Sequence, residues 1–306
     1  MTEQEVLDAR LTYYCQPIRD TQMHGWGKAE LLVRAWGPDR TPYPTEEFIH
    51  AAEECGRIAR IDLQALKHAC WMLPSYLKKG ITQLGVNVSL LSLRQEEFQT
   101  EAVAVLQQYS EICRYLVIEI TESAPGEKEE WMRPALERLS RCGVDIAVDD
   151  FGKDHAGIFR ILNMPFQYIK LDRAIVSQCY RDPFARLVTQ KIVEAMHLGG
   201  KEIVAEGVET AAQAQELEQM GVRYLQGYYW SPPVPEITFL GHLASSVQPG
   251  GEKRSAAGGQ EAKPPGQRHP MRRKVGAKQK PRRLCGAWNN ASENSKERGV
   301  LLWEKH

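Results

Sequence analysis

The sequence lacks several features that would place the chain in a special class. No stretch approaches the roughly 18 consecutive apolar residues that a membrane-spanning helix requires, and the start, MTEQEVLDAR, does not have the basic and then apolar pattern of a signal peptide. The seven cysteines are scattered without CxxC spacing. These absences predict a cytoplasmic protein without a membrane span, whose cysteines are reduced structural thiols rather than disulfides or zinc ligands.

The formal net charge is zero because two oppositely charged segments cancel. Residues 248–306 contain about 14 Lys and Arg against about 5 Asp and Glu, so the preceding part of the chain is acidic by about nine charges. The same segment is rich in Pro and Gly and has no sustained apolar periodicity, which predicts a disordered basic tail. Such a tail either binds an anionic partner, a nucleic acid or a membrane surface, or is solvated without a dedicated partner.

The part of the chain before the tail alternates short β-branched or apolar runs with amphipathic stretches. The strand candidates are 11–18, 28–34, 83–89, 115–122, 144–150, 167–172, 202–209 and 223–229. Helical stretches follow most of them, for example 45–54 continuing through 60–79, then 128–142, 173–198 and 210–220. The first strand instead turns directly into the second. The pattern predicts an α/β fold over residues 8–240, a (β/α)₈ TIM-like barrel with one antiparallel strand near its start. No GxGxxG motif opens a helix, which argues against a dinucleotide-binding Rossmann fold.

Polar side chains gather at the carboxyl ends of these strands, where the active site of such a barrel lies. The residues are Glu30, Arg34, Asn87, Glu119, Glu122, Asp149, Asp150, Lys170, Asp172, Glu206, Glu209 and Gln226. A single carboxylate at a strand end is more often a helix cap or half of an ion pair. Five or more at one mouth would repel one another unless cations lie between them.

The ligand chemistry favours hard cations. Oxygen donors with one amide, and no His or Cys, suit Mg²⁺ or Mn²⁺ rather than zinc. Two such ions are a known solution to phosphodiester hydrolysis, and the adjacent Asp149 and Asp150 can serve both. Lys170 can orient or deprotonate the nucleophile, or stabilise developing charge, and Arg34 can hold a phosphate. The residues alone predict a metal-dependent phosphoryl-group hydrolase.

A set of ordered motifs then gives a resemblance to a known family. The motifs are ExLxR at 30–34, the asparagine of NVS at 87, ExTE at 119–122, DDFG at 149–152, KxD at 170–172, EGVE at 206–209, QGY at 226–228, and PTEEFIHAAEECG at 44–56. Over about residues 10 to 238 the sequence resembles the EAL-domain family of bacterial barrel proteins that hydrolyse the second messenger cyclic di-GMP to linear pGpG.

The resemblance implies roles for individual residues. It implies that one metal is held by Glu30, Asn87, Glu119 and Asp149, and a second by Asp149, Asp150 and Glu206. It also implies that Lys170 assists the catalytic water, that Glu209 and Gln226 support the water network or the ligand, and that Arg34 contacts a phosphate. Asp172, the last residue of KxD, is assigned to substrate binding, and a homodimer is a further property that the family implies.

One segment departs from the family pattern. After DDFG the family continues TGYSSL, a loop that helps to position the metal-binding aspartates and takes part in dimerisation, whereas this chain has Lys153 to Ile158. The change removes a glycine and two serines that could cap a helix or bond to Glu122, and Lys153 is a candidate ionic partner for Glu122. A loop or interface role fits His155 better than metal ligation. Trp26, Trp36 and Trp230 either pack at the barrel rim or stack on guanine.

Three functions are consistent with these observations. The first is an active cyclic di-GMP phosphodiesterase with two Mg²⁺ or Mn²⁺ ions. The second is a catalytically weak or silent EAL domain that acts as a cyclic di-GMP receptor or as a regulator that contacts another protein, because of the altered loop. The third is an interaction protein whose basic tail contacts nucleic acid.

Overall fold

The structure is a computed structural model, which describes residues 1–23, 25–121, 130–152 and 164–246, all within the unit Met1–Gly251. Its strands are β1 (Arg10–Asp20), β2 (Gly25–Trp36), β3 (Gln83–Asn87), β4 (Leu116–Thr121), β5 (Asp145–Phe151), β6 (Tyr168–Leu171), β7 (Glu202–Ala205), β8 (Tyr224–Leu225) and β9 (Val234–Pro235). Its helices are α1 (Glu3–Asp8), α2 (Thr45–Glu54), α3 (Ile58–Lys78), α4 (Leu90–Leu93), α5 (Glu96–Gln108), η1 (Cys113–Tyr115), α6 (Met132–Ser140), α8 (Arg173–Arg181), α9 (Pro183–Leu198), α10 (Ala211–Gln219) and α11 (Glu236–Ser246).

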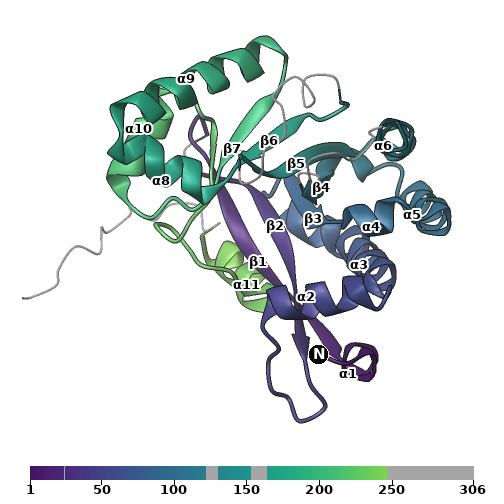
Figure 1. Cartoon of the computed structure of the whole chain (residues 1–306). Helices are drawn as coiled ribbons and strands as arrows, with labels where there is room; N and C mark the ends of the chain where they lie inside the picture. Colours follow the sequence, from purple (N-terminus) through teal and green to yellow (C-terminus); the bar gives the residue numbers. More distant parts are fainter. Residues whose placement is uncertain (24, 122–129, 153–163, 247–306) are drawn as a thin grey trace, which may run out of the picture. The chain divides into compact units, whose positions relative to one another are not determined.

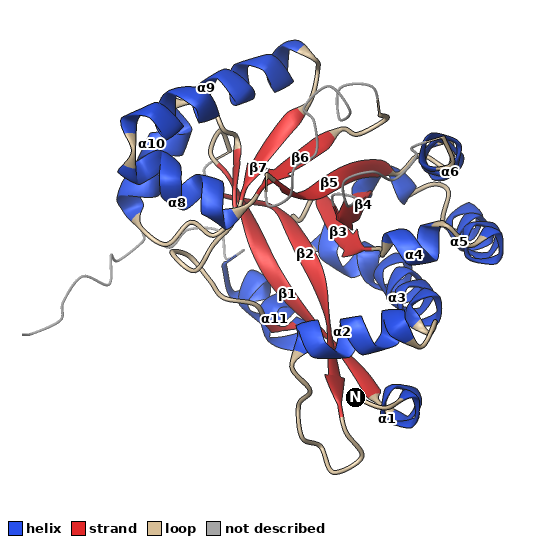
Figure 2. Ribbon diagram, in the orientation of Figure 1, coloured by secondary structure: helices blue, strands red, loops and turns tan. Residues whose placement is uncertain are grey.

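The strands close into a barrel. Their order is β2-β3-β4-β5-β6-β7-β8-β1, and β1 also pairs with β2, which completes the circle. Neighbouring strands from β2 to β8 run parallel, whereas β1 is antiparallel to both β2 and β8. The helices lie around the strands in Figures 1 and 2. This arrangement confirms the predicted (β/α)₈ barrel with one antiparallel strand near its start, and the short β9 adds an edge beside β1.

The core explains why these residues form strands and helices. Parallel strands are covered on both faces, so their residues are apolar almost throughout, as Leu84 and Val86 of β3 are. In α3 the buried positions recur at helical spacing, for example Ile61, Ala65 and Ala69, and the opposite face is solvated. The barrel and its helices therefore share one large hydrophobic cluster.

The helical stretch expected over 173–198 is two helices rather than one. Proline cannot continue a helix but fits its first turn, and Pro183 is the first residue of α9. Asp182 ends α8 and caps α9, because its side chain accepts a hydrogen bond from the backbone N–H of Phe184 at 3.0 Å. The single helix was a wrong prediction, although the Asp-Pro pair marks the break in the sequence.

Some predicted features fall on other parts of the chain. His24, Glu122, the altered loop 153–158 with Lys153 and His155, and the basic tail 248–306 lie outside the described residues. The domain boundaries 8–240 and 248–306 stay predictions. Within the described part, Cys15, Cys55, Cys70, Cys113, Cys142 and Cys179 are free thiols. No described helix combines the length and the apolar character needed to cross a membrane.

Candidate functional site

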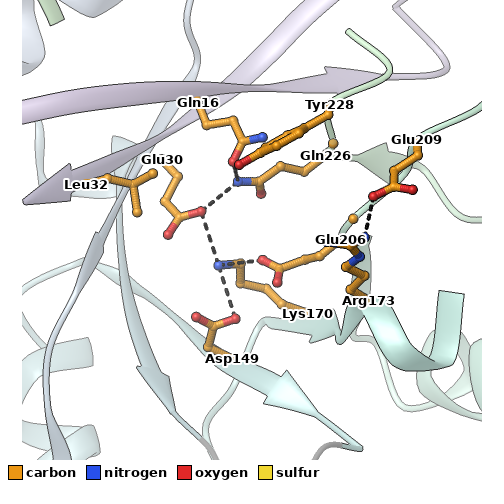
Figure 3. Close-up of a pocket in the computed structure, with 12 residues that line it drawn as sticks. Gln16, Glu30, Leu32, Asp149, Lys170, Arg173, Glu206, Glu209, Gln226 and Tyr228 are labelled. Atoms are coloured by element: carbon orange, nitrogen blue, oxygen red, sulfur yellow. Dashed lines mark hydrogen bonds and ion pairs between the residues drawn. The ribbon is translucent and has the colours of Figure 1, made fainter. Parts of the chain in front are cut away.

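The carboxyl ends of the parallel strands bring most of the predicted site residues together. Pairing between β3 and β4 sets Asn87 opposite Glu119, and pairing between β2 and β3 sets Glu30 opposite Gly85. A cavity of about 260 Å³ opens at this mouth (Figure 3). Its lining includes Glu30, Asp149, Lys170, Glu206, Glu209 and Gln226.

Lys170 is the centre of the cluster. Its side chain is 1% exposed, and its Nζ lies 2.6 Å from Glu119 Oε2, 2.8 Å from Glu206 Oε1, 3.1 Å from Asp149 Oδ1 and 3.4 Å from Glu30 Oε2. Each of these carboxylates comes from a different strand or the residue that follows one. One buried cation therefore faces four carboxylates, a combination that is costly unless further positive charge binds.

The pKa values reflect this shortage of positive charge. Burial raises the pKa of Glu119 to about 8, and the charges of Glu30 and Asp149 add to that effect against the attraction of Lys170. Burial also raises the pKa of Asp149, and it raises the pKa of Glu206 well above its ordinary value. Burial opposes the charge of Lys170 as well, but Asp149, Glu119, Glu206 and Glu30 together raise its pKa well above the usual range.

Glu30 differs from the other carboxylates because amides hold it. Burial favours its neutral form, but Lys170 and hydrogen bonds from Gln226 and Asn87 outweigh burial and lower its pKa. Gln226 Nε2 donates to Glu30 Oε2 at 2.7 Å and Asn87 Nδ2 donates to Glu30 Oε1 at 2.8 Å. Glu30 is thus ionised and fixed in orientation. The other polar atom of Gln226, Oε1, is buried and has no hydrogen-bond partner among the described residues.

Asp149 and Asp150 both serve the same mouth, although successive strand residues normally face opposite sides. The pairing of β5 with β6 is interrupted between Val148 and Phe151, and Asp150 has a positive φ of 55°. Its backbone N–H donates to Asp149 Oδ1 at 2.8 Å. This bulge-like irregularity turns the second carboxylate toward the first, a device that is frequent beside active sites.

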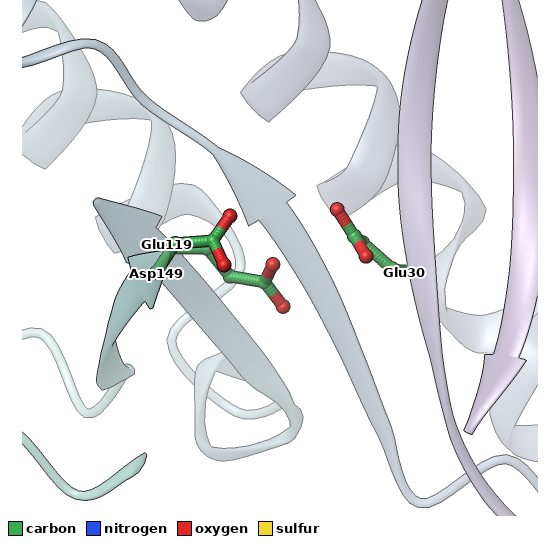
Figure 4. Close-up of side chains that lie close together, drawn as sticks. All are labelled: Glu30, Glu119 and Asp149. Atoms are coloured by element: carbon green, nitrogen blue, oxygen red, sulfur yellow. The ribbon is translucent and has the colours of Figure 1, made fainter. Parts of the chain in front are cut away.

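Two groups of acidic side chains have the spacing of metal ligands. Glu30, Glu119 and Asp149 form one group (Figure 4), and Asp149, Asp150 and Glu206 form the other. In each group, one oxygen from every residue lies within 4.8 Å of the others. Asp149 belongs to both. The donors are carboxylate oxygens, so the residues fit hard divalent cations such as Mg²⁺ or Mn²⁺. The first group contains the three carboxylates of the first set that the resemblance implies, whose fourth member is Asn87, and the second group has the same residues as the second set. The metal-binding roles stay predictions.

The remaining predicted residues lie around this centre. Glu209 is at the rim, where it pairs with Arg173 at 2.5 Å, and both side chains are largely exposed. Asp172 caps α8 by accepting from the backbone N–H of Ala174 at 2.7 Å, and it is not one of the residues that line the cavity. Arg34 lies farther along β2, with its guanidinium 5.4 Å from the centre of the Tyr14 ring.

Among the lining residues that sequence reasoning missed, three carry polar or aromatic side chains: Gln16, Arg173 and Tyr228. Gln16 accepts from Gln226 Nε2 at 3.0 Å and lies opposite Glu30 in the β1–β2 pairing. Because β1 is antiparallel, its middle rather than its carboxyl end lies at the mouth, and inspection of strand ends passes over it. Arg173 opens the helix that follows KxD, and Tyr228 ends the QGY motif. Trp26 and Trp230 pack against the core, in agreement with the packing alternative.

A second cavity of about 220 Å³ adjoins the first, and Leu32 borders both. Its lining combines apolar side chains of α2 and α3 with polar groups: Ile49, Ile58, Ile61, Arg34, Glu53, Asp62 and Asn87. Asp62 Oδ2 accepts from Ser92 Oγ at 2.6 Å and from the backbone N–H of Ser89 at 2.8 Å. The mouth therefore offers an elongated site with carboxylates at its centre and an apolar compartment beside it.

The fold and the acidic centre define the class of the protein, a (β/α)₈ barrel with candidate metal ligands at the carboxyl end of its strands. Comparison with known proteins gives the family. The profile of the EAL domain matches residues 2–233. The chain is 31% identical over 229 residues to the cyclic di-GMP phosphodiesterase PdeL of Escherichia coli, which covers 74% of this chain and 63% of PdeL. It is 29% identical over 231 residues to the signaling protein YkoW of Bacillus subtilis, covering 75% of this chain but only 29% of YkoW.

Solved structures agree. The phosphodiesterase PaMucR in complex with c-di-GMP has a TM-score of 0.68 and 28% identity, covering 75% of this chain and 94% of that chain. An EAL domain protein from Listeria monocytogenes has a TM-score of 0.72 at 22% identity, covering 80% and 98%, which shows the shared fold. The chain belongs to the EAL domain family. It spans about three tenths to two thirds of the length of the curated relatives named above.

Proposed function

We propose that this protein is a metal-dependent phosphodiesterase that hydrolyses cyclic di-GMP to linear pGpG. The observation that carries the proposal is the pair of acidic groups that share Asp149 around the buried Lys170. The relative PdeL is a cyclic di-GMP phosphodiesterase by name, and PaMucR was solved with c-di-GMP. The reaction adds one water across a P–O bond of the cyclic dinucleotide, which opens the ring and leaves a terminal phosphate.

The acidic groups would hold the cations. Glu30, Asn87, Glu119 and Asp149 would bind one ion, and Asp149, Asp150 and Glu206 the other. When bound, the ions would screen the phosphate charge and acidify the attacking water. They would also supply the positive charge that four carboxylates around one lysine lack.

The protein's own side chains orient the reactants. Lys170 has three N–H donors at the centre of the cluster, so it can donate to the water or to a phosphate oxygen as negative charge develops. Gln226 holds Glu30 through its Nε2, and its buried Oε1 is left to accept a hydrogen bond from the water or the ligand. Arg34 lines the second cavity, which supports the proposal that it contacts a phosphate outside the reacting centre.

The second cavity suits one base of the substrate. A purine ring would contact Ile49, Ile58 and Ile61, and the N–H groups of guanine would meet the carboxylates of Glu53 and Asp62. Hydrogen bonds occupy Oδ2 of Asp62, which leaves Oδ1 to contact the base. Because Leu32 borders both cavities, a dinucleotide with one phosphate at the carboxylates can extend a base into this compartment.

Product analysis tests the proposal. The full chain is incubated with cyclic di-GMP and Mg²⁺ or Mn²⁺, and products are separated by chromatography with mass detection. We expect pGpG from the unmodified chain and from Glu202→Gln, a control at the opposite end of the barrel, but not from Glu119→Gln. Binding of cyclic di-GMP without product would contradict hydrolysis and support a receptor, and neither binding nor product would favour a protein-interaction role.

A further inference from the structure

The ribbon formed by β1 and β2 extends beyond the barrel mouth. The two strands pair along their whole length, from Arg10 opposite Trp36 to Asp20 opposite Gly25. On its other side β2 pairs with β3 only over Lys28–Leu31. The residues from Leu32 to Trp36 and their partners on β1 therefore project past the mouth as an arm. The arm is two-stranded from Val33 to Trp36, whereas Tyr14, the partner of Leu32, also pairs with Pro235 of β9.

One face of this arm is covered and the other is not. Ala35 belongs to a small core cluster with Phe48 and Ala52 of α2, so the odd-numbered positions of β2 face that helix. The even-numbered positions face the other way. There Leu32, Arg34 and Trp36 of β2 lie opposite Tyr14, Thr12 and Arg10 of β1. The β2 residues of this face are half-buried and Arg10 is exposed, although Glu30 on the same face is buried in the acidic centre.

The tip of the exposed face carries a shallow groove of about 430 Å³, lined by Asp8, Arg10, Thr12, Trp36, Pro38 and Arg40. Trp36 Nε1 donates to Thr12 Oγ1 at 2.7 Å, which fixes the indole across the ribbon. Among the described residues, no carboxylate forms an ion pair with Arg10 or Arg40. Asp8 is the one acidic side chain in the lining, and the amide of Gln4 donates to it at 2.8 Å.

From these observations we propose that the exposed face of the β1–β2 arm binds linear single-stranded oligonucleotides, from the groove at its tip to the barrel mouth. Charge complementarity selects this ligand class, because Arg10 and Arg40 outnumber Asp8 in the groove at the tip, and Arg34 lies between that groove and the mouth on β2 of an otherwise acidic barrel. The indole of Trp36 supplies the flat surface on which an unpaired base stacks. Double-stranded nucleic acid has no free base faces to offer to such a ring.

The length of the arm fits a short strand. Trp36 is six residue steps along β2 from Glu30, which is about 20 Å of extended chain. Successive phosphates of one strand are about 3.4 Å apart along a helix axis, so this distance corresponds to about six stacked nucleotides. The inference goes beyond hydrolysis of cyclic di-GMP and does not depend on it.

The test measures binding of a fluorescein-labelled hexa-adenylate ribonucleotide to the full chain by fluorescence anisotropy, with EDTA present. The double variant Arg10→Gln/Arg40→Asn removes both tip charges, and asparagine tolerates the positive φ of 68° at position 40. The double variant Lys78→Gln/Arg181→Gln is the charge-matched control, since both side chains are exposed at helix ends elsewhere. Trp36→Leu tests stacking, after its melting temperature has been compared with that of the unmodified chain.

We expect the tip variant to bind about tenfold more weakly than the control at about 50 mM salt. The slope of log K against log salt should fall by about 1.4, or about 0.7 for each phosphate that the variant no longer neutralises. Trp36→Leu should also lose about tenfold in affinity. Equal affinity of the tip variant and its control would overturn the inference and place binding elsewhere, for instance in residues 248–306. Failure of the unmodified chain to bind at about 50 mM salt would overturn it too.

The same preparations separate this inference from the proposed function. Cyclic di-GMP turnover of the tip variant should equal that of the unmodified chain, because Arg10 and Arg40 lie outside both cavities at the mouth. If the tip variant loses oligonucleotide binding but the unmodified chain does not hydrolyse cyclic di-GMP, the proposed oligonucleotide site is supported and the phosphodiesterase proposal is rejected. If the unmodified chain hydrolyses cyclic di-GMP and both double variants bind the oligonucleotide equally well, the phosphodiesterase proposal is supported and the oligonucleotide site is rejected.

Discussion

Lys170 Nζ lies 2.6 Å from Glu119 Oε2 at the centre of the barrel mouth, and both side chains are less than 5% exposed. The positive charge of Lys170 is shared with Asp149, Glu206 and Glu30, so the lysine neutralises at most one of the four carboxylates. Stability and ligand affinity are consequently linked at this point. Removal of Lys170 or displacement of Glu119 changes the uncompensated negative charge at the mouth, and with it the stabilisation that a bound cation provides.

Replacement of the lysine should make stability depend on metal. In Lys170→Met the four carboxylates keep no internal cation, and breaking a buried pair typically costs about 3–5 kcal/mol. We expect a loss of this order in urea unfolding with EDTA and partial recovery with Mn²⁺, whereas the exposed Lys78→Met changes by less than about 0.5 kcal/mol. A Lys170→Met chain whose urea midpoint is the same in EDTA and Mn²⁺ would argue against a cation site.

Gly85 leaves the space that Glu119 occupies. A Cβ at this position would collide with Glu119 Oε1 and lie 2.8 Å from its Cδ. In Gly85→Ala the carboxylate must therefore turn away from Lys170, and an active-site displacement of about 1 Å can cost about 100-fold in rate. We expect cyclic di-GMP turnover to fall by about that factor in a chain that still folds by circular dichroism. The control is Gly241→Ala in α11, where an added methyl meets nothing within 4 Å. Unchanged turnover in Gly85→Ala would show that the position of Glu119 is not critical.

Most of the fold could be predicted because the apolar periodicity of a strand or helix extends over several residues and the strand-then-helix pattern recurs along the chain. All eight expected strands occur, and the turn after β1 correctly indicated an antiparallel pair. The two-residue strand β9 carries too short a pattern to be seen. The break at Asp182–Pro183 was readable as a cap followed by a first-turn proline, but the apolar periodicity on both sides outweighed it.

Part of the candidate site could be predicted from the sequence and part could not. Parallel strands all end at one mouth, so their polar last residues converge and could be identified together. The contribution of Gln16 depends on the direction of β1, and the convergence of Asp149 and Asp150 depends on one backbone angle at position 150. Neither is encoded in a spacing rule. The clearance at Gly85 likewise follows only from the pairing of β3 with β4.

Asp62 should make stability fall as pH rises. Burial raises its pKa to about 7 in the folded chain, with a further contribution from Glu53, against hydrogen bonds from Ser92 and Ser89. The unfolded chain releases this proton near pH 4, so the folded state binds more protons between about pH 4 and 7. The stabilisation is complete below about pH 4 and is lost by about pH 7, with a slope of up to about 1.4 kcal/mol per pH unit.

Asp62→Asn keeps an acceptor for Ser89 and Ser92 but cannot titrate. Urea unfolding at several pH values should show a flatter profile for this variant, by up to one proton, than for the unmodified chain. Glu97→Gln on the exposed face of α5 is the control and should leave the slope unchanged. Parallel profiles for Asp62→Asn and the unmodified chain would mean that Asp62 is ionised in the folded protein throughout this range.

The rim pair of Arg173 and Glu209 should matter for turnover and little for stability. Both side chains are about half exposed or more, so their ion pair contributes at most about 1 kcal/mol to folding. Arg173 also packs over Gly207, whose φ of 64° and lack of a side chain let the loop after β7 approach the arginine stem. Arg173 thereby positions Glu209 over the cavity.

We expect Arg173→Gln and Glu209→Gln each to lower kcat/KM about tenfold. The double variant should be no worse than the poorer single variant, because the effects of residues that act through one contact are not additive. Losses that multiply in the double variant would show that the arginine and the glutamate act on the substrate independently.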